Sequence, residues 1–399
     1  MENCAPVNYP EFAAVTLKKS SGNILYKNRE QSLVKHQFLI QYIQGAAFKT
    51  LQGYSNTFNY VDAFAGPWHL SDMDAFSDAS FTQAIKMLED VKKELVRIGG
   101  KEPRIRFILC EKRAESVALL LQYAEDHKEL EIHVFQGEFE QNLPAISKAI
   151  PDGFTFTFID PTGWKIRNRE IFSFLRARKG DFLLNFMSDH INRHAEYSGV
   201  TESIGHFVAD PDWASEFDAL SSTLSNEERI LCLLKKKVKQ EKVAIYCPDF
   251  SIFVPRKERI KMRLILGTNS AKGLEVFRDV QAKVELAQAE IRNEIKLELS
   301  PEGNLFEATE LAKISVEKTG VGGRESLKSA TTLLQSMLRS RGPTRFEILM
   351  PNILEEVPIR VVQLKDLLIE LRARGAISFE LPLRKKKPQP DTLISFRSA

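Results

Sequence analysis

Short apolar runs alternate with helical patterns through the first half of the chain, and this alternation constrains the fold more than any other feature. The β-rich runs lie at residues 57–64, 104–110, 131–137, 154–160 and 181–187. Between them, apolar residues return every three or four positions, as at Phe81, Ile85 and Leu88, which is the spacing of one helix face. Strands and helices that alternate in this way predict an α/β domain with a Rossmann-like, mostly parallel sheet.

The segments after these strands predict an insertion, an edge strand and a second domain. Residues 188–240 are mostly polar with helical spacing, and we interpret them as a helical insertion. The run RIKMRLILGT (259–268) is expected to add an antiparallel strand at the sheet edge. We place the first domain at 1–300, a linker with a glycine-rich turn at 301–325, and a second domain at 326–399.

The second domain has three helical patterns followed by two β-rich runs that the basic segment RKKKPQP joins. This is the order of a winged helix-turn-helix, in which the third helix and the loop between the strands can contact nucleic acid. The net charge of the whole chain is only +3, so such a contact must come from a local patch. Winged helices also bind proteins, and that alternative stays open. The candidate nucleic-acid residues are Arg360, Gln363, Lys365, Lys385, Lys386 and Lys387.

Acidic residues follow four of the predicted strands, at Asp62, Glu111, Glu138 and Asp160. Ligands of an open α/β sheet bind at the carboxyl ends of its strands. A single acid in such a place is often only a cap for the next helix. Four in successive loops favour a cofactor site instead.

S-adenosylmethionine fits this set of acids. It requires an anion near its ammonium and sulfonium charges, a carboxylate for two ribose hydroxyls and an acceptor for the adenine amine. We assign these contacts to Asp62, Glu111 and Glu138 in turn, and Asp160 is expected beside the methyl group. The other candidate cofactor residues are Phe64, Ala65, Gly66 and Pro67 in the first loop and Lys112 in the second.

Dinucleotide binding is the competing interpretation, and the sequence excludes it. That site requires G-x-G-x-x-G with an acid about 20 residues later. The stretch DAFAGPW (62–68) has one glycine, and Glu111 comes much later. A P-loop is absent as well.

The turn Asp160-Pro161-Thr162-Gly163-Trp164 is the candidate site of methyl transfer. Methyltransferases that act on the amino group of a flipped base use D/N-P-P-Y/F, whose aromatic ring stacks on the base. Asp160 and Pro161 fit that pattern, whereas Thr162 does not and Trp164 comes one place late. Trp164 is therefore either a stacking residue or part of the core.

His190 is a further catalytic candidate, because it follows the fifth strand close to Asn185 and can accept a proton. It lies four residues before His194, but no third ligand accompanies the pair, so no metal site is predicted. A metal-dependent hydrolase is unsupported, because Asp160, Asp181 and Asp189 lack a linking spacing.

The composition indicates a soluble cytoplasmic protein. Hydrophobic residues make up 43% and charged residues 27% of the chain, the balance of a globular protein. The four cysteines are scattered, as expected in a reducing compartment. No secretory signal is evident, and no apolar run is long enough to span a membrane.

Taken together, the motifs YVDAFAGP, GEFEQNLP, FTFIDPTGW and RLILGTNSAKGLEVF, with the helix KHQFLIQYI before them, resemble the three-Cys-motif partner family (TcmP). That family is similar to class I S-adenosylmethionine-dependent methyltransferases. The resemblance implies a partner protein with a three-cysteine motif, a bacterial host and a phage-defence or mobile-element setting. Many members have glycine where this chain has Trp68, so its first loop can approach a ligand less closely.

Two hypotheses follow. The chain is a methyltransferase-like protein that acts on or with DNA or RNA, or it is a catalytically inactive adaptor whose winged helix binds nucleic acid or a partner protein.

Overall fold

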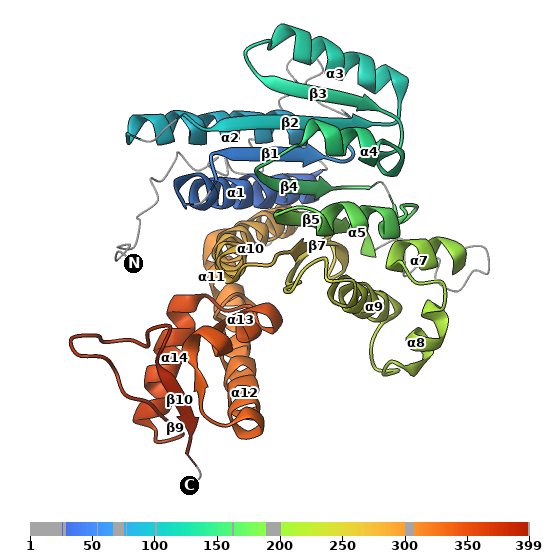
Figure 1. The fold of residues 1–399 in the computed structure, drawn as a ribbon. Coiled ribbons are helices and arrows are strands. Elements are labelled where there is room, and N and C mark those ends of the chain that lie inside the picture. The colour runs from blue at the N-terminus through green and yellow to red at the C-terminus, as the bar shows by residue number, and fades with distance from the viewer. Residues whose placement is uncertain are drawn as a thin grey trace.

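A central sheet of seven strands organises the first part of the chain (Figure 1). The computed structural model describes residues 26, 29–53, 55–66, 76, 78–99, 102–161, 163–188, 201–299 and 307–397. The strands lie side by side in the order β3-β2-β1-β4-β5-β7-β6. They are β1 (Thr57–Asp62), β2 (Arg104–Glu111), β3 (Glu131–Gln136), β4 (Phe154–Ile159), β5 (Gly180–Phe186), β6 (Asp249–Phe253) and β7 (Ile260–Gly267).

The strand directions confirm a mostly parallel sheet. The pairs among β1 to β5 are all parallel, and β7 runs antiparallel to both of its neighbours. One detail of the prediction is wrong, because the antiparallel strand is not the edge strand: β6 lies outside it. The burial explains the order, since the end of β7 is buried without a break, whereas β6 alternates between buried and partly exposed residues.

Helices cover both faces of the sheet, as the apolar strands predict. One face packs against α1, α2, α3 and α10, and the other against α4, α5, α7 and α9. The bounds of these helices are α1 (Glu30–Gly53), α2 (Ser80–Arg97), α3 (Ala114–Asp126), α4 (Phe139–Ala149), α5 (Asn168–Arg176), α7 (Thr201–Val208), α9 (Asn226–Gln240) and α10 (Ala271–Leu299). A further helix, α8 (Trp213–Ala219), lies between α7 and α9. The described part of the expected insertion, residues 201–240, is thus mainly helical.

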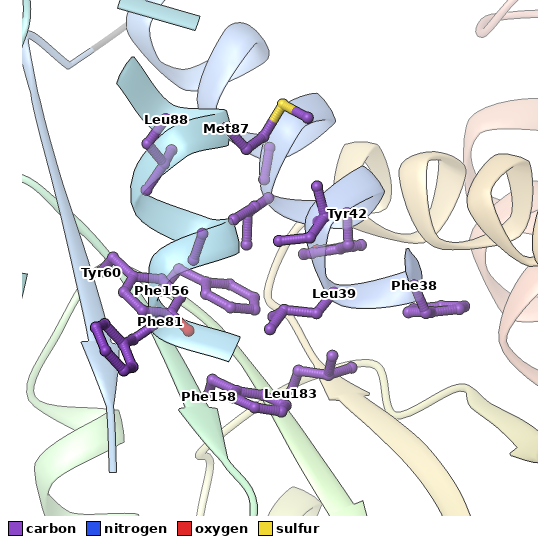
Figure 2. Close-up of a cluster of buried hydrophobic side chains, with 14 of the residues drawn as sticks. Phe38, Leu39, Tyr42, Tyr60, Phe81, Met87, Leu88, Phe156, Phe158 and Leu183 are labelled. Carbon is purple, nitrogen blue, oxygen red and sulfur yellow. The ribbon is translucent and has the colours of Figure 1, made fainter. Parts of the chain in front are cut away.

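The core beneath α1 is largely aromatic. Figure 2 shows Phe38, Leu39 and Tyr42 of α1 facing Phe156 and Phe158 of β4. Tyr42 and Phe156 have ring centroids 5.7 Å apart, within the range of favourable aromatic contacts. This packing holds α1 across the middle of the sheet.

The C-terminal part contains helices and a small sheet of its own. Its three-stranded antiparallel sheet has the order β8-β10-β9, and a separate apolar core lies between this sheet and the helices. The elements are α12 (Arg324–Arg341), β8 (Thr344–Arg345), α13 (Phe346–Glu356), α14 (Val361–Ala373), β9 (Ile377–Ser378) and β10 (Leu393–Phe396). Part of the segment predicted as a linker forms a helix, α11 (Ala308–Thr319), because its Ala312 is buried and the helix packs against α10.

A buried arginine joins the two parts of the chain. Arg278 of α10 donates from Nε to the carbonyl of Leu354 (2.6 Å) and from Nη2 to the carbonyl of Glu355 (2.8 Å). These carbonyls lie in the last turn of α13, where the helix leaves acceptors unsatisfied. Burial lowers the pKa of Arg278 to about 10. None of the described helices is long and apolar enough to cross a bilayer.

Candidate cofactor and transfer site

The parallel strands bring the predicted acids to one edge of the sheet. Asp62 and Glu111 are the last residues of β1 and β2. Glu138 precedes α4 after β3, and Asp160 follows β4 directly. In the sheet, β2 and β3 lie on one side of β1, and β4 and β5 lie on the other. The strand order therefore reverses between β1 and β4, and open α/β sheets bind their ligands at such a switch point.

Asp62 is completely buried and organises the first loop. Its Oδ1 accepts the backbone N–H of Phe64 (3.2 Å), and its Oδ2 accepts the hydroxyls of Ser80 (3.0 Å) and Tyr60 (3.2 Å). Burial raises the pKa of Asp62 to about 6, against the lowering effect of these donors, and the negative charge of Asp160 adds to the increase. Asp62 therefore positions the turn and the start of α2, and its charge changes close to neutral pH.

The loop after Asp62 passes between the ends of the neighbouring strands. The N–H of Ala63 donates to Phe158 of β4, and the N–H of Ala65 donates to Cys110 of β2, both at 2.9 Å. Ala65 is buried, whereas Phe64 and Gly66 are partly exposed. The predicted residues Pro67 and Trp68 lie outside the described residues.

Glu111 keeps part of its hydrogen-bonding capacity for a ligand. It is 4% exposed, and its Oε1 accepts the backbone N–H of Arg113 (2.7 Å). Among the residues that the structure describes, no donor contacts Oε2. A nearly buried carboxylate with one such oxygen at the end of β2 suits a pair of ribose hydroxyls.

Glu138 and Lys112, both predicted to bind cofactor, are paired with each other. Lys112 Nζ contacts Glu138 Oε1 at 2.9 Å, and Arg167 lies 3.8 Å from Glu138 Oε2. The hydrogen bond from Lys112 lowers the pKa of Glu138. This pair is solvent-accessible, so a ligand amine can take the place of Lys112 at little energetic cost.

Asp160 is held by two groups, Lys35 and Asn185. Lys35 of α1 forms an ion pair with Oδ2, and the amide of Asn185 donates to Oδ1 (2.6 Å). The side chains of Lys35 and Asp160 are mostly buried. Because Asn185 must present its amide nitrogen to a carboxylate, its own oxygen points elsewhere. That oxygen is buried without a hydrogen-bond partner among the described residues.

Lys35 belongs to an unusual run of buried polar residues. Lys35, His36 and Gln37 are all less than 10% exposed, although they are consecutive on α1. His36 contacts the hydroxyl of Tyr26 (2.9 Å), and burial, followed by the charge of Lys35, holds its pKa well below 6.5. Consecutive polar residues inside an otherwise apolar helix, KHQFLIQYI, were the available signal for this contact.

The remaining catalytic candidates are placed as follows. Pro161 is buried beside Asp160. Trp164 is partly buried and packs against the same apolar cluster as Phe64. His190 lies outside the described residues. No group of three potential metal ligands occurs in the described part of the chain.

The candidate nucleic-acid residues of α14 contact protein. The amide of Gln363 donates to the carbonyl of Val321 (3.3 Å), and Lys365 lies over the ring of Phe346 (5.3 Å). Arg360 and Gln363 line a hollow between α10, α11 and α14. In the loop that follows β9, Lys385 and Lys386 are exposed, whereas Lys387 pairs with Asp366 of α14.

The other basic run, on α9, is neutralised by neighbouring acids. Lys235, Lys236, Lys237 and Lys239 form ion pairs with Asp249, Glu216, Asp210 and Glu355 respectively. These ion pairs indicate that the basic run LKKKVKQEK (234–242) is a structural surface and not a binding site.

Comparison with known proteins finds methyltransferases. A putative caffeoyl-CoA O-methyltransferase from Staphylococcus aureus is 12% identical, over 59% of this chain and 82% of that one, with a TM-score of 0.30. An O-methyltransferase from Bacillus cereus in complex with SAH is 8% identical, over 60% and 80%, with a TM-score of 0.30. The O-methyltransferase TomG from Streptomyces achromogenes in complex with SAM is 10% identical, over 60% and 80%, with a TM-score of 0.29.

No family profile and no curated protein matches the sequence. The TM-scores are low, so the fold assignment depends on the sheet itself. The seven strands are mostly parallel, and helices cover both faces of the sheet. The chain has a Rossmann-like fold.

The residues at the carboxyl edge fit S-adenosylmethionine. Glu111 offers an acceptor at the end of β2, Glu138 offers another after β3, and Asp62 supplies a negative charge at the end of β1. Two buried oxygens at the end of β5, Asn185 Oδ1 and Ser188 Oγ, have no partner among the described residues. Since buried polar groups in proteins are nearly always hydrogen-bonded, these two atoms indicate room for a donor at the transfer site.

Proposed function

We propose that this chain is an S-adenosylmethionine-dependent methyltransferase that modifies an amino group of a nucleic acid, in complex with a three-Cys-motif protein. The observation that supports it best is the convergence of Asp62, Glu111, Glu138 and Asp160 at one edge of a methyltransferase-like sheet. S-adenosylmethionine, when bound, supplies an electrophilic methyl group.

The protein residues would divide the work as follows. Glu111 would accept the ribose hydroxyls, and Glu138 would exchange Lys112 for the adenine amine. Asp62 would hold the first loop in place and face the positive charges of the cofactor.

An amine acceptor is favoured by the arrangement around Asp160. Lys35 and Asn185 already occupy both oxygens of Asp160. Asn185 is 2% exposed, and its Oδ1 has no partner in the described part of the chain. This oxygen would accept an N–H of the methyl acceptor. The ion pair between Lys35 and Asp160 fixes the carboxylate that accepts the Asn185 amide, and this prevents the amide group from flipping.

The C-terminal unit supports the nucleic-acid part of the proposal. A short strand lies between its first two helices, and β10 lies between β8 and β9. This order of three helices and a hairpin is that of a winged helix, and its loop carries exposed lysines. The partner protein, the bacterial host and the phage-defence setting rest on the resemblance to the TcmP family.

Calorimetry and methyl transfer test this proposal together. We expect the full chain to bind S-adenosylmethionine, and we expect radiolabelled methyl transfer to DNA or RNA when the partner is present. Asn185→Leu should abolish transfer while the cofactor still binds. Absence of cofactor binding, with and without partner, would refute the enzyme proposal.

A second function, the inactive adaptor, is favoured by the same ion pair. Lys35 saturates Asp160, the acid expected to contact the acceptor, and Lys112 occupies Glu138. Cofactor binding without transfer to DNA, RNA or the partner would identify the chain as an adaptor.

A further inference from the structure

The loop between β9 and β10 presents its tip to solvent. Figure 1 shows this loop extending away from the helices of the C-terminal unit. Its returning half is anchored, because the N–H of Glu347 donates to Pro390 and that of Phe346 donates to Thr392, both at 2.9 Å. At the tip, the N–H of Lys385 donates to the carbonyl of Pro382 (3.0 Å), which closes a tight turn.

The turn displays an apolar side chain among cations. Leu383 is 91% exposed, the highest value among the large apolar side chains that the structure describes. Arg384, which follows it, has a φ of +68°, a conformation uncommon for any residue with a side chain. Arg384, Lys385 and Lys386 are all exposed, and within the described residues they have no ion-pair partner. The turn thus holds one leucine and three free positive charges outward.

The exposed face of α14 has the opposite character. Val362, Asp366 and Glu370 succeed one another every four residues and are all exposed. Their acids are paired, Asp366 with Lys387 and Glu370 with Arg374. Because these acids are paired with cations, this face is close to neutral and offers little net attraction to a phosphate backbone. The third helix is therefore poorly suited to lie in a groove of nucleic acid.

We propose that the C-terminal unit binds duplex DNA through the loop tip, defined as Leu383–Lys386, and not through α14. Leu383 inserts between base pairs from the minor groove, and Arg384, Lys385 and Lys386 contact the flanking phosphates. This rests on the proposed nucleic-acid function and specifies which surface performs it.

The small apolar surface of the loop tip favours DNA over a protein or a membrane as the ligand. Proteins that kink DNA insert single apolar side chains between base steps while cations neutralise the backbone. A stable protein interface requires roughly 800 Å² from each partner, far more than one leucine provides. Bilayer binding likewise requires a larger apolar surface. One leucine with three cations matches a base-step wedge.

DNA binding by the full chain tests the proposal. Fluorescence anisotropy with a labelled duplex of about 25 base pairs, sized to span a bent site, is measured as a function of salt. The plot of log Kobs against log salt has a negative slope, and removing three phosphate contacts makes this slope shallower by about 3. We expect this reduction for the triple variant Arg384→Ala, Lys385→Ala, Lys386→Ala, with weaker binding at every salt concentration.

Two matched controls separate the tip from general charge and from apolar exposure. The triple variant Lys313→Ala, Lys318→Ala, Lys328→Ala removes three exposed cations from α11 and α12, and its slope should change by less than about 1. Leu383→Ala should reduce DNA bending, measured by energy transfer between end labels, without changing the slope. Val362→Ala, at a side chain 60% exposed on α14, should change neither.

The outcomes distinguish this inference from the proposed function. If the wild-type chain binds DNA and the tip variant has the wild-type slope, the loop is not the contact and the inference is wrong, while nucleic-acid binding stands. If the wild-type chain binds no duplex DNA at low salt, the DNA-binding role itself is refuted. Loss of binding to anionic phospholipid vesicles by Leu383→Ala, with DNA binding unchanged, would identify a membrane surface instead.

Discussion

Replacing Asp62 with asparagine should stabilise the protein at neutral pH and weaken cofactor binding. Burial raises the pKa of Asp62 from 3.8 to about 6. The folded state therefore favours the protonated form, and ionised Asp62 opposes folding at pH values above its folded pKa. This penalty disappears as the pH falls below the unfolded value, because the group is then neutral in both states.

The magnitude follows from the size of the shift. Two pKa units correspond to about 3 kcal/mol at about 1.4 kcal/mol per unit, and Asp62 is fully buried, so solvent does not screen the effect. Asp62→Asn should gain up to about 3 kcal/mol in unfolding free energy near pH 7.5, and only about 1 kcal/mol near pH 4.5. Its amide can still accept the N–H of Phe64, so the turn is preserved.

Asp181 offers a matched control at the opposite edge of the sheet. It lies near the start of β5, accepts the hydroxyl of Tyr42 (2.8 Å), and has a pKa that burial raises to about 6. Asp181→Asn should therefore stabilise with the same pH dependence. Only Asp62→Asn should weaken S-adenosylmethionine binding, by about 10-fold for one lost charge-assisted contact.

Urea unfolding followed by tryptophan fluorescence measures the effect in the first domain. The three tryptophans are at positions 68, 164 and 213, so the signal omits the C-terminal unit. A difference between Asp62→Asn and wild type that stays constant between pH 4.5 and 7.5 would refute the reasoning. Equal loss of cofactor affinity in Asp181→Asn would refute the assignment of Asp62 to the site.

Three further results are expected. Glu111→Gln should weaken S-adenosylmethionine binding about 10- to 100-fold, because a hydrogen bond to a charged acceptor contributes about 1.5–3 kcal/mol. Calorimetry measures this, with Glu115→Gln as the exposed control. Equal affinities of the two variants for the cofactor would exclude a ribose contact by Glu111. Lys35→Met should lower the unfolding free energy by about 1–3 kcal/mol, because Asp160 is left without its cation. In a double-mutant cycle, the double variant with Asp160→Asn should recover much of this loss. Additive effects of the two substitutions would show that the pair does not interact. Arg278→Met should expose the junction of the two parts to limited proteolysis, since carbonyls at the end of α13 lose their donors; an unchanged digestion pattern would show that the junction does not depend on this arginine.

The parts of the fold that depend on local pattern were predictable. The alternation of strands and helices and the mostly parallel sheet follow from periodicities within single segments. The position of the antiparallel strand was missed, because β7 and β6 are both short apolar runs and only pairing decides which one lies outside. Helix α11 cannot be distinguished from a linker in the sequence, because it buries few of its residues.

The contacts within the site required the tertiary structure. Lys35 and Asp160 are 125 residues apart, and no local pattern relates them. Gln363 lies at the start of α14, where recognition residues are expected, yet it contacts the turn at Val321. Sequence shows that such residues are polar, but not which partner each one meets.

The sequence by itself determined that acids stand at the ends of successive parallel strands, because strand ends follow from the local apolar pattern. Their different states were decided only by tertiary structure. Burial raises the pKa of Asp62 to about 6, Glu111 keeps an acceptor, and Asp160 forms an ion pair with a lysine from α1. Charge and hydrogen bonding depend on neighbours in space, and those neighbours come from helices and strands that are distant in the chain.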